Sequence, residues 1–310
     1  MTNTEKQLSL EINSENLNYY INVNDVEVLS AIGNAPNKQS IPINQWVLNG
    51  QNSLLVSVNL KDEDANNKLK TANTDKLTVS LVLTEFKDNQ KYSYTISTFD
   101  LAPSAEKSDK LGSSSSGNYR LNSSDNYNKA NSGDVVVSEW VETDMKKWSD
   151  FTQAIDINIG MPEWAYLSAD NLGDDQTLSD DDYYSLLDGV YQALEDIWAL
   201  MEKKDLQAML KLTAIRSNDF DGAYYLKPGS KQKEMEQSLS SAFNHKDLYL
   251  DELVAKNRAN LVIEANGKII RLDVQQVGGP MMFYSHKDDA FTRYYQFYFM
   301  KKDGKLIIVR

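Results

Sequence analysis

Residues 179–201, SDDDYYSLLDGVYQALEDIWALM, decide the fold of the C-terminal half of this chain. Ser179 and Asp182 are spaced as a capping box, and Asp180–Asp182 occupy the first turn, where the helix dipole favours negative charge. Apolar side chains then recur every three or four residues, which predicts the buried seam of an amphipathic helix. The seam consists of Tyr183, Leu187, Val190, Leu194, Ile197 and Met201. Its burial contributes on the order of 10 kcal/mol before entropy, so we expect it to anchor a core of its own.

The segments after this helix predict two further helices and then antiparallel strands. One helix is expected over about residues 205–216, and Pro228-Gly229-Ser230 introduces the next. The hydrophobic period then drops to two, and Asn266-Gly267 between alternating apolar runs predicts a hairpin. Helices followed by a meander of antiparallel strands are typical of an α+β domain.

The closing strands are aromatic. Strands over Phe291–Met300 and Leu306–Val309 are predicted to turn at Asp303-Gly304. The element order from Asp180 to Arg310, with this aromatic strand and its Asp303-Gly304-Lys305 turn, resembles the nuclear transport factor two family. That resemblance implies a cystatin-like α+β cone, in which helices pack into the concave face of a curved antiparallel sheet. Because members of the family include enzymes, binders and assembly domains, the resemblance implies no function.

The first hundred residues alternate apolar and polar side chains in short segments separated by turn residues. Leu77-Val79-Leu81-Leu83 alternates strictly, and Lys91–Phe99 continues the pattern. Ile41–Trp46, followed by Asn49-Gly50 and Leu54–Val58, predicts a hairpin. Short strands with little helical periodicity predict an all-β antiparallel sandwich, and the Trp46 hairpin resembles those of Ig-like and jelly-roll modules.

A chain of 310 residues is expected to form two domains. We expect the β-sandwich over residues 1–165 and the cone over residues 179–310, joined by an acidic connector over 166–178. Residues 102–133 are rich in Ser, Asn, Gly and Lys, which cannot build a core, so they predict a mobile insertion in the sandwich. Val135–Val137 and the alternation from Ile155 to Ile159 are expected to complete the sandwich; the alternative is that they pair with the second domain.

No catalytic signature occurs in the sequence. The absence of cysteine excludes disulfides, thiolate metal sites and a cysteine nucleophile. There is no G-x-S-x-G, no phosphate-binding glycine loop and no H-E-x-x-H. The only histidines, His245 and His286, are expected to have structural or surface roles. We therefore predict a protein that is not an enzyme and has no cofactor.

A calcium loop fails the test of spacing. When Gly222 is aligned with the loop glycine, Ser217, Asp219 and Asp221 fall at the first three ligand positions. Pro228 then stands where the bidentate Glu is required. We therefore predict no metal site; the alternative is a looser calcium site within Asp170–Asp175.

The aromatic residues between Phe283 and Phe299 leave two interpretations open. They would line a ligand pocket in the mouth of a cone, or they would form core and cross-strand pairs. The candidate pocket residues are Tyr225, Tyr284, His286 and Arg293, with Arg293 as the polar group.

Thirteen carboxylates and no Lys or Arg occur between Trp148 and Glu202, in a chain whose net charge is −13. An acidic chain repels phosphates, which argues against nucleic acid, and no window is apolar enough for a membrane span. Helix capping and solubility are one interpretation of this stretch, and a docking surface for a basic protein is the other. The expected docking residues are Asp170, Asp174, Asp175, Asp180, Asp181 and Asp182.

In type, the chain looks like a bacterial immunity protein that neutralises a toxin or secreted effector, although no motif identifies a particular immunity family. One alternative is an exported β-sandwich module that binds carbohydrate or a cell-surface ligand, for which Trp46 and Trp140 should be exposed. Another is a cone-domain enzyme or small-molecule binder. An export signal removed in front of Met1 would place the protein in the periplasm or outside the cell, and otherwise it would be cytoplasmic. The oligomeric state is left open.

Overall fold

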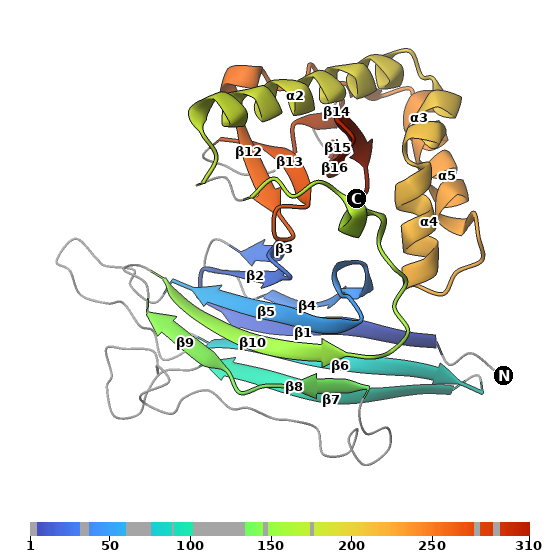
Figure 1. Ribbon diagram of the computed structural model, residues 1–310. Helices are drawn as coiled ribbons and strands as arrows, with labels where there is room; N and C mark the ends of the chain where they lie inside the picture. Colours follow the sequence, from blue (N-terminus) through green and yellow to red (C-terminus); the bar gives the residue numbers. More distant parts are fainter. Residues whose placement is uncertain are drawn as a thin grey trace. The chain divides into compact units, whose positions relative to one another are not determined.

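The computed structural model describes residues 5–31, 37–59, 76–88, 90–101, 134–144, 148–173, 177–275, 280–287 and 292–310. The chain divides into two compact units, Met1–Pro162 and Glu163–Arg310 (Figure 1). The first unit therefore ends close to the boundary predicted at residue 165. The predicted insertion, 102–133, lies outside the described residues.

The first unit is built from antiparallel strands in two sheets. One sheet has the order β4-β1-β6-β7 and the other β3-β2-β5-β10-β8, with β9 also paired to β10. The rings of Phe99 on β7 and Phe151 on β10 lie 4.8 Å apart, so the two sheets pack against each other. The strands are β1 (Glu5–Glu15), β2 (Tyr19–Val23), β3 (Val26–Ala31), β4 (Asn37–Pro42), β5 (Gly50–Val58), β6 (Lys76–Lys87), β7 (Gln90–Leu101), β8 (Val135–Val137), β9 (Val141–Asp144) and β10 (Ser149–Ile157).

The hairpin predicted around Asn49-Gly50 is wrong. Its two strands belong to different sheets, because β4 pairs with β1 whereas β5 pairs with β2 and β10. Between them, Asn44–Trp46 forms a 3₁₀ helix. The side chain of Asn44 accepts a hydrogen bond from the backbone N–H of Leu8 at 2.7 Å, which holds this crossing to β1. The strands β8 and β10 pair within this unit, as predicted.

The second unit begins with the 3₁₀ helix Ala165–Ser168 and contains all the α-helices among the described residues. The predicted capping box and seam are confirmed: Asp182 donates its backbone N–H to Ser179 Oγ at 3.2 Å, and five of the six seam residues are fully buried. The helix predicted over residues 205–216 is two helices that meet at Thr213. The helices are α2 (Asp180–Glu202), α3 (Leu206–Leu212), α4 (Ala214–Ala223) and α5 (Ser230–Asn244).

The strands of the second unit form two antiparallel sheets, β11-β14-β15 and β12-β13-β16-β17. The predicted hairpin at Asn266-Gly267 joins β12 to β13. The long strand predicted over Phe291–Met300 is wrong, because residues 296–298 break it and its halves enter different sheets. The strands are β11 (Leu248–Leu250), β12 (Ala259–Glu264), β13 (Ile269–Val274), β14 (Met282–His286), β15 (Thr292–Tyr295), β16 (Phe299–Lys302) and β17 (Lys305–Ile308).

The predicted connector, 166–178, lies in the second unit, and its first part is hydrogen-bonded to β16 and to the turn between β12 and β13. Asp170 donates its backbone N–H to Lys301 O at 2.8 Å, and Leu172 donates to Gly267 O at 3.0 Å. Gly267 has a φ of +81°, and a Cβ there would meet Asn171 Oδ1 at 2.5 Å and Gly173 O at 2.6 Å. This turn therefore needs glycine for its backbone conformation and for the close approach of the segment.

The core of the second unit lies between α2 and its sheets. The seam of α2 packs with alternate residues of β12 and β13, including Leu261, Ile270 and Leu272. Since side chains alternate across a strand, the residues between them, such as Arg271, are placed on the opposite face of the sheet. Within the described part of the chain, no helix is long and apolar enough to cross a membrane.

Candidate functional site

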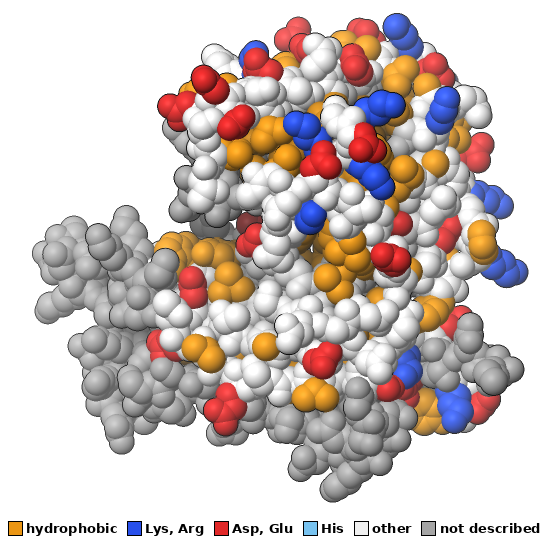
Figure 2. All heavy atoms as spheres, viewed as in Figure 1, with side chains coloured by type: hydrophobic (Ala, Val, Ile, Leu, Met, Phe, Trp, Pro, Cys, Tyr) orange, Lys and Arg blue, Asp and Glu red, His pale blue; other side chains and the backbone are white. Residues whose placement is uncertain are grey.

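The outward face of α2 is acidic along its whole length. Asp181, Asp188, Glu195 and Glu202 are seven residues apart and exposed, opposite the buried seam. Seven residues bring a helix nearly back to the same direction, so neighbouring members lie almost in line and about 10 Å apart along the axis. Tyr184, which is 62% exposed, lies on the same face. We call these four carboxylates the acidic stripe; acidic side chains follow α2 across the face shown in Figure 2.

Local structure accounts for little of this charge. The helix α2 holds seven carboxylates and no Lys or Arg, whereas the rest of the second unit has nearly equal numbers of acidic and basic residues. Asp182 is explained by capping, because Ser179 Oγ donates to its carboxylate at 2.6 Å. Among the described residues, the only ion pair of the stripe joins Asp188 to Lys256 at 3.0 Å, and both side chains are about half exposed. Such an exposed pair contributes little, about 0–1 kcal/mol.

The other predicted docking residues are only partly placed. Asp170 is exposed, whereas Asp174 and Asp175 lie outside the described residues. Of the remaining carboxylates of the acidic stretch, Asp150 and Asp156 belong to β10 in the first unit. Asp150 accepts a hydrogen bond from Ser57 Oγ. The acidic stretch is thus divided between the two units, with seven of its carboxylates on α2.

Three of the four candidate pocket residues share one face of the β11-β14-β15 sheet. Tyr284 pairs in register with Arg293, and His286 follows two residues along β14. Arg293 Nη2 lies 3.5 Å from Ser241 Oγ. Tyr225 is elsewhere: it follows α4 with a φ of 54°.

The aromatic residues of the closing strands belong mainly to the core. Tyr284, Phe297 and Phe299 are buried there, and Tyr284 meets the Tyr295 ring edge-on at 6.0 Å. Burial raises the pKa of Tyr284 to about 12, with a smaller contribution from Tyr295. Tyr294, by contrast, is 70% exposed. This packing favours the core interpretation over a pocket lined by these rings.

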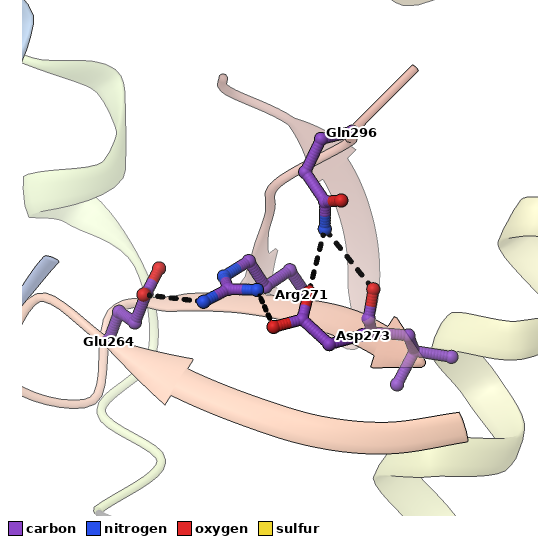
Figure 3. A network of polar contacts seen from close by, with 5 residues as sticks. Glu264, Arg271, Asp273 and Gln296 are labelled. Carbon is purple, nitrogen blue, oxygen red and sulfur yellow. Dashed lines mark hydrogen bonds and ion pairs between the residues drawn. The ribbon is translucent and has the colours of Figure 1, made fainter. Parts of the chain in front are cut away.

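A buried ionic network lies on the face of β13 that points away from α2 (Figure 3). Arg271 Nη2 donates to Glu264 Oε1 at 3.1 Å, and its Nη1 is paired with the carboxylate of Asp273. Gln296 Nε2 donates to Asp273 Oδ1 at 3.2 Å. Burial opposes the charge of Arg271, but Glu264 and Asp273 outweigh burial and raise its pKa. Because Arg271 is paired with both carboxylates, the network is suited to hold the sheet in place.

A second buried arginine, Arg310, is enclosed by aromatic rings. Its guanidinium carbon lies 4.2 Å from the centre of the Trp164 ring and 5.1 Å from that of Tyr166. Nη1 lies 3.4 Å from Asp219 Oδ2. Burial raises the pKa of Asp219, and Arg310 opposes this rise. Both residues are charged groups inside the fold that serve its packing.

The residues tested for a calcium loop are structural as well. Asp219 and Asp221 lie in α4 instead of a loop. The carboxylate of Asp221 accepts from the backbone N–H groups of Gly229 at 2.7 Å and Lys231 at 2.8 Å. It therefore caps the start of α5, where the helix dipole favours an anion.

Sequence reasoning missed a cluster of three potential metal ligands. His245, Asp247 and His286 place one ligand atom each within 4.8 Å of the others. His245 and Asp247 are two residues apart and could have been noticed, but His286 lies 41 residues after His245. Only strand pairing brings it to them.

The tryptophans that a carbohydrate-binding surface would need are buried. Trp46 is 9% exposed and Trp140 is 5% exposed. The ring of Trp140 packs against Phe99 at 5.2 Å. Their burial counts against the carbohydrate-binding alternative. Comparisons of the chain with protein-family models, with curated proteins and with solved structures found no match.

Proposed function

We propose that this chain is a non-enzymatic binding protein whose acidic stripe docks onto a basic protein. The observation that carries the proposal is the row of Asp181, Asp188, Glu195 and Glu202, exposed on the side of α2 opposite its buried seam. Concentrating one sign of charge on a single helix face adds self-repulsion to the folded state. A basic surface on a partner protein would offset that charge. The charge would also favour such a partner over proteins whose surfaces are not basic.

The composition of this face suits a protein partner. Tyr184 adds an exposed aromatic ring beside the carboxylates, and aromatic residues are enriched among those that dominate binding energy at protein interfaces. The stripe spans about 30 Å along the helix, because each residue rises 1.5 Å. A partner with Lys or Arg at matching intervals would contact several carboxylates at once. Of the predicted docking residues, Asp181 belongs to the stripe, and Asp180 and Asp182 flank it in the first turn of α2.

The type of protein that fits best is a bacterial immunity protein that neutralises a toxin or secreted effector. An acidic surface and the absence of catalytic motifs support this assignment. We further propose that the two sheets of the first unit form a β-sandwich of Ig-like or jelly-roll-like type. The second unit, with its helices beside antiparallel strands, is proposed to be a cone of the nuclear transport factor two type. These folds are compatible with several functions, so the acidic stripe carries the proposal.

The test compares two variants with the same change in net charge. The stripe variant is Asp181→Asn/Asp188→Asn/Glu195→Gln/Glu202→Gln. The control variant neutralises four exposed carboxylates of the first unit, Glu5→Gln/Glu11→Gln/Glu139→Gln/Asp156→Asn. Each protein is immobilised and used to capture basic proteins from an extract of the source organism at low and at physiological salt.

We expect a basic protein to be captured by the wild type and by the control variant, and to be lost with the stripe variant. With that protein purified, its association rate at low salt should fall by about tenfold or more on neutralising the stripe. Equal loss with both variants would show that only net charge matters and would exclude a docking surface on α2. For the immunity assignment, the captured protein should be toxic when expressed alone and harmless when this chain is co-expressed.

A further inference from the structure

The two histidines of this chain lie next to each other in the folded protein. The chain has only His245 and His286, and their ring centres are 5.8 Å apart. The carboxylate of Asp247 lies close to both rings. The three potential ligand atoms, one from each residue, all lie within 4.8 Å of one another. His245 and Asp247 are exposed, and His286 is half-buried.

The fold holds these residues together from two elements. His245 follows the last residue of α5, and Asp247 precedes the first residue of β11. The strand β11 pairs with the end of β14, where Leu248 is opposite His286. Lys287 donates its backbone N–H to Asp247 O at 3.0 Å, which extends the pairing to the residue beside the cluster. The backbone positions of all three residues are therefore set by strand pairing and by the end of α5.

Two imidazoles and one carboxylate are ligands that suit divalent first-row transition metals. Zinc bonds to His nitrogen and carboxylate oxygen are about 2.0–2.2 Å long, which places tetrahedral ligand atoms about 3.3 Å apart. The ligand atoms therefore need to approach one another by up to about 1.5 Å, which rotation of exposed side chains allows. The backbone N–H of Asp247 lies 3.2 Å from His245 Nδ1 in a long hydrogen bond. A metal at that nitrogen would replace this bond.

We propose that His245, Asp247 and His286 bind one divalent transition metal ion of the zinc type, with the remaining coordination positions open to water. The neighbouring cation is a weak competitor: Lys287 Nζ lies 3.7 Å from Asp247 Oδ1, and both side chains are more than half exposed. An exposed pair of this kind contributes about 0–1 kcal/mol. The site is separate from the acidic stripe and does not depend on its function.

The chain allows an unusually clean test, because it has no cysteine and no other histidine. The full chain, with any affinity tag removed, is titrated with zinc chloride in metal-free buffer by calorimetry. We expect one ion per chain. The variants His245→Ala and Asp247→Asn change exposed residues and should each weaken binding by about tenfold or more, at least the loss seen when outer-shell partners of a metal site are removed. Lys287→Ala is the matched control and should bind zinc as well as the wild type or more tightly.

Weak binding to surface carboxylates is the main competing explanation. The stripe variant should retain the zinc site, whereas binding that disappears with the stripe and survives His245→Ala would overturn the proposal. Nuclear magnetic resonance gives an independent readout, since only two histidine rings contribute signals. Both rings should shift together and saturate at one equivalent of zinc. A shift of one ring alone, or of neither, would also overturn it.

Discussion

The Arg271 network and the acidic stripe lie in the same unit but differ in how their charges are balanced. Arg271 is buried between two carboxylates, and a glutamine amide donates to one of them. The stripe places four carboxylates in water, and only Asp188 has a cation beside it within the described residues. Burial makes an unpaired charge very costly, so each buried carboxylate of this network is paired with Arg271. Exposed carboxylates are solvated by water and cost little free energy. The surface can therefore carry an excess of negative charge that a partner can bind.

The largest expected effect comes from breaking the buried side of this comparison. Arg271→Met leaves Glu264 and Asp273 buried without their cation, and the free energy of unfolding of the second unit should fall by about 3–5 kcal/mol. The α-helices of the described chain all lie in this unit, so urea denaturation followed by helical circular dichroism reports its stability.

The matched variant is Glu264→Gln/Arg271→Met/Asp273→Asn, which removes the charges together. It should recover a large part of the loss, because no unpaired charge stays buried. If Arg271→Met alone cost less than about 1 kcal/mol, the network would not be needed for stability, and the contrast with the stripe would fail.

A smaller effect is expected at high pH from the Arg310 cluster. Burial raises the pKa of Tyr166 to about 12, although Arg310 opposes this rise. The folded protein therefore keeps this proton at a pH where the unfolded chain, with an ordinary pKa of 10.0, has lost it. The resulting stability is complete below pH 10 and is lost between pH 10 and 12.

Tyr166→Phe removes this titration. Between pH 9 and pH 11 the wild type should lose about 1 kcal/mol more unfolding free energy than the variant. Urea denaturation at the two pH values measures the difference. Equal losses in the two proteins would mean that the Tyr166 phenol is not shielded from water as its burial implies.

The smallest effect is expected from neutralising the stripe itself. Its carboxylates are about 10 Å apart along the helix, a little more than the Debye length of about 8 Å at physiological salt. Their mutual repulsion is therefore screened, and the stripe variant should change the unfolding free energy by less than about 1 kcal/mol. Asp221→Ala, which removes one buried carboxylate and its two hydrogen bonds, should cost about 2–3 kcal/mol. A stripe variant that unfolds more easily than Asp221→Ala would assign the stripe a structural role.

The sequence predicted the parts of the fold that local chemistry controls. The capping box at Ser179, the seam of α2 and the turn at Asn266-Gly267 occur as expected. Which strands pair with each other was harder to predict from the sequence. Asn49-Gly50 has the composition of a hairpin turn, but the strands before and after it belong to different sheets. Asn44, between them, is hydrogen-bonded to Leu8 of β1.

The candidate sites divide in the same way. The acidic stripe follows from a spacing of seven residues on a helix, which is visible once the buried seam is known. Tyr284 was a candidate both for a pocket and for the core, and its packing against Tyr295 places it in the core. The His245–Asp247–His286 cluster was not predicted, because its histidines are brought together only by the pairing of β11 with β14.

By itself the sequence determined one amphipathic helix, its excess of negative charge and the alternation of its strands, since these depend on neighbours a few residues apart. The tertiary structure alone decided which strands share a sheet, which arginines are enclosed and where the two histidines meet. Those outcomes depend on contacts between residues far apart in the chain. Their energies come from burial and pairing, which no local pattern records.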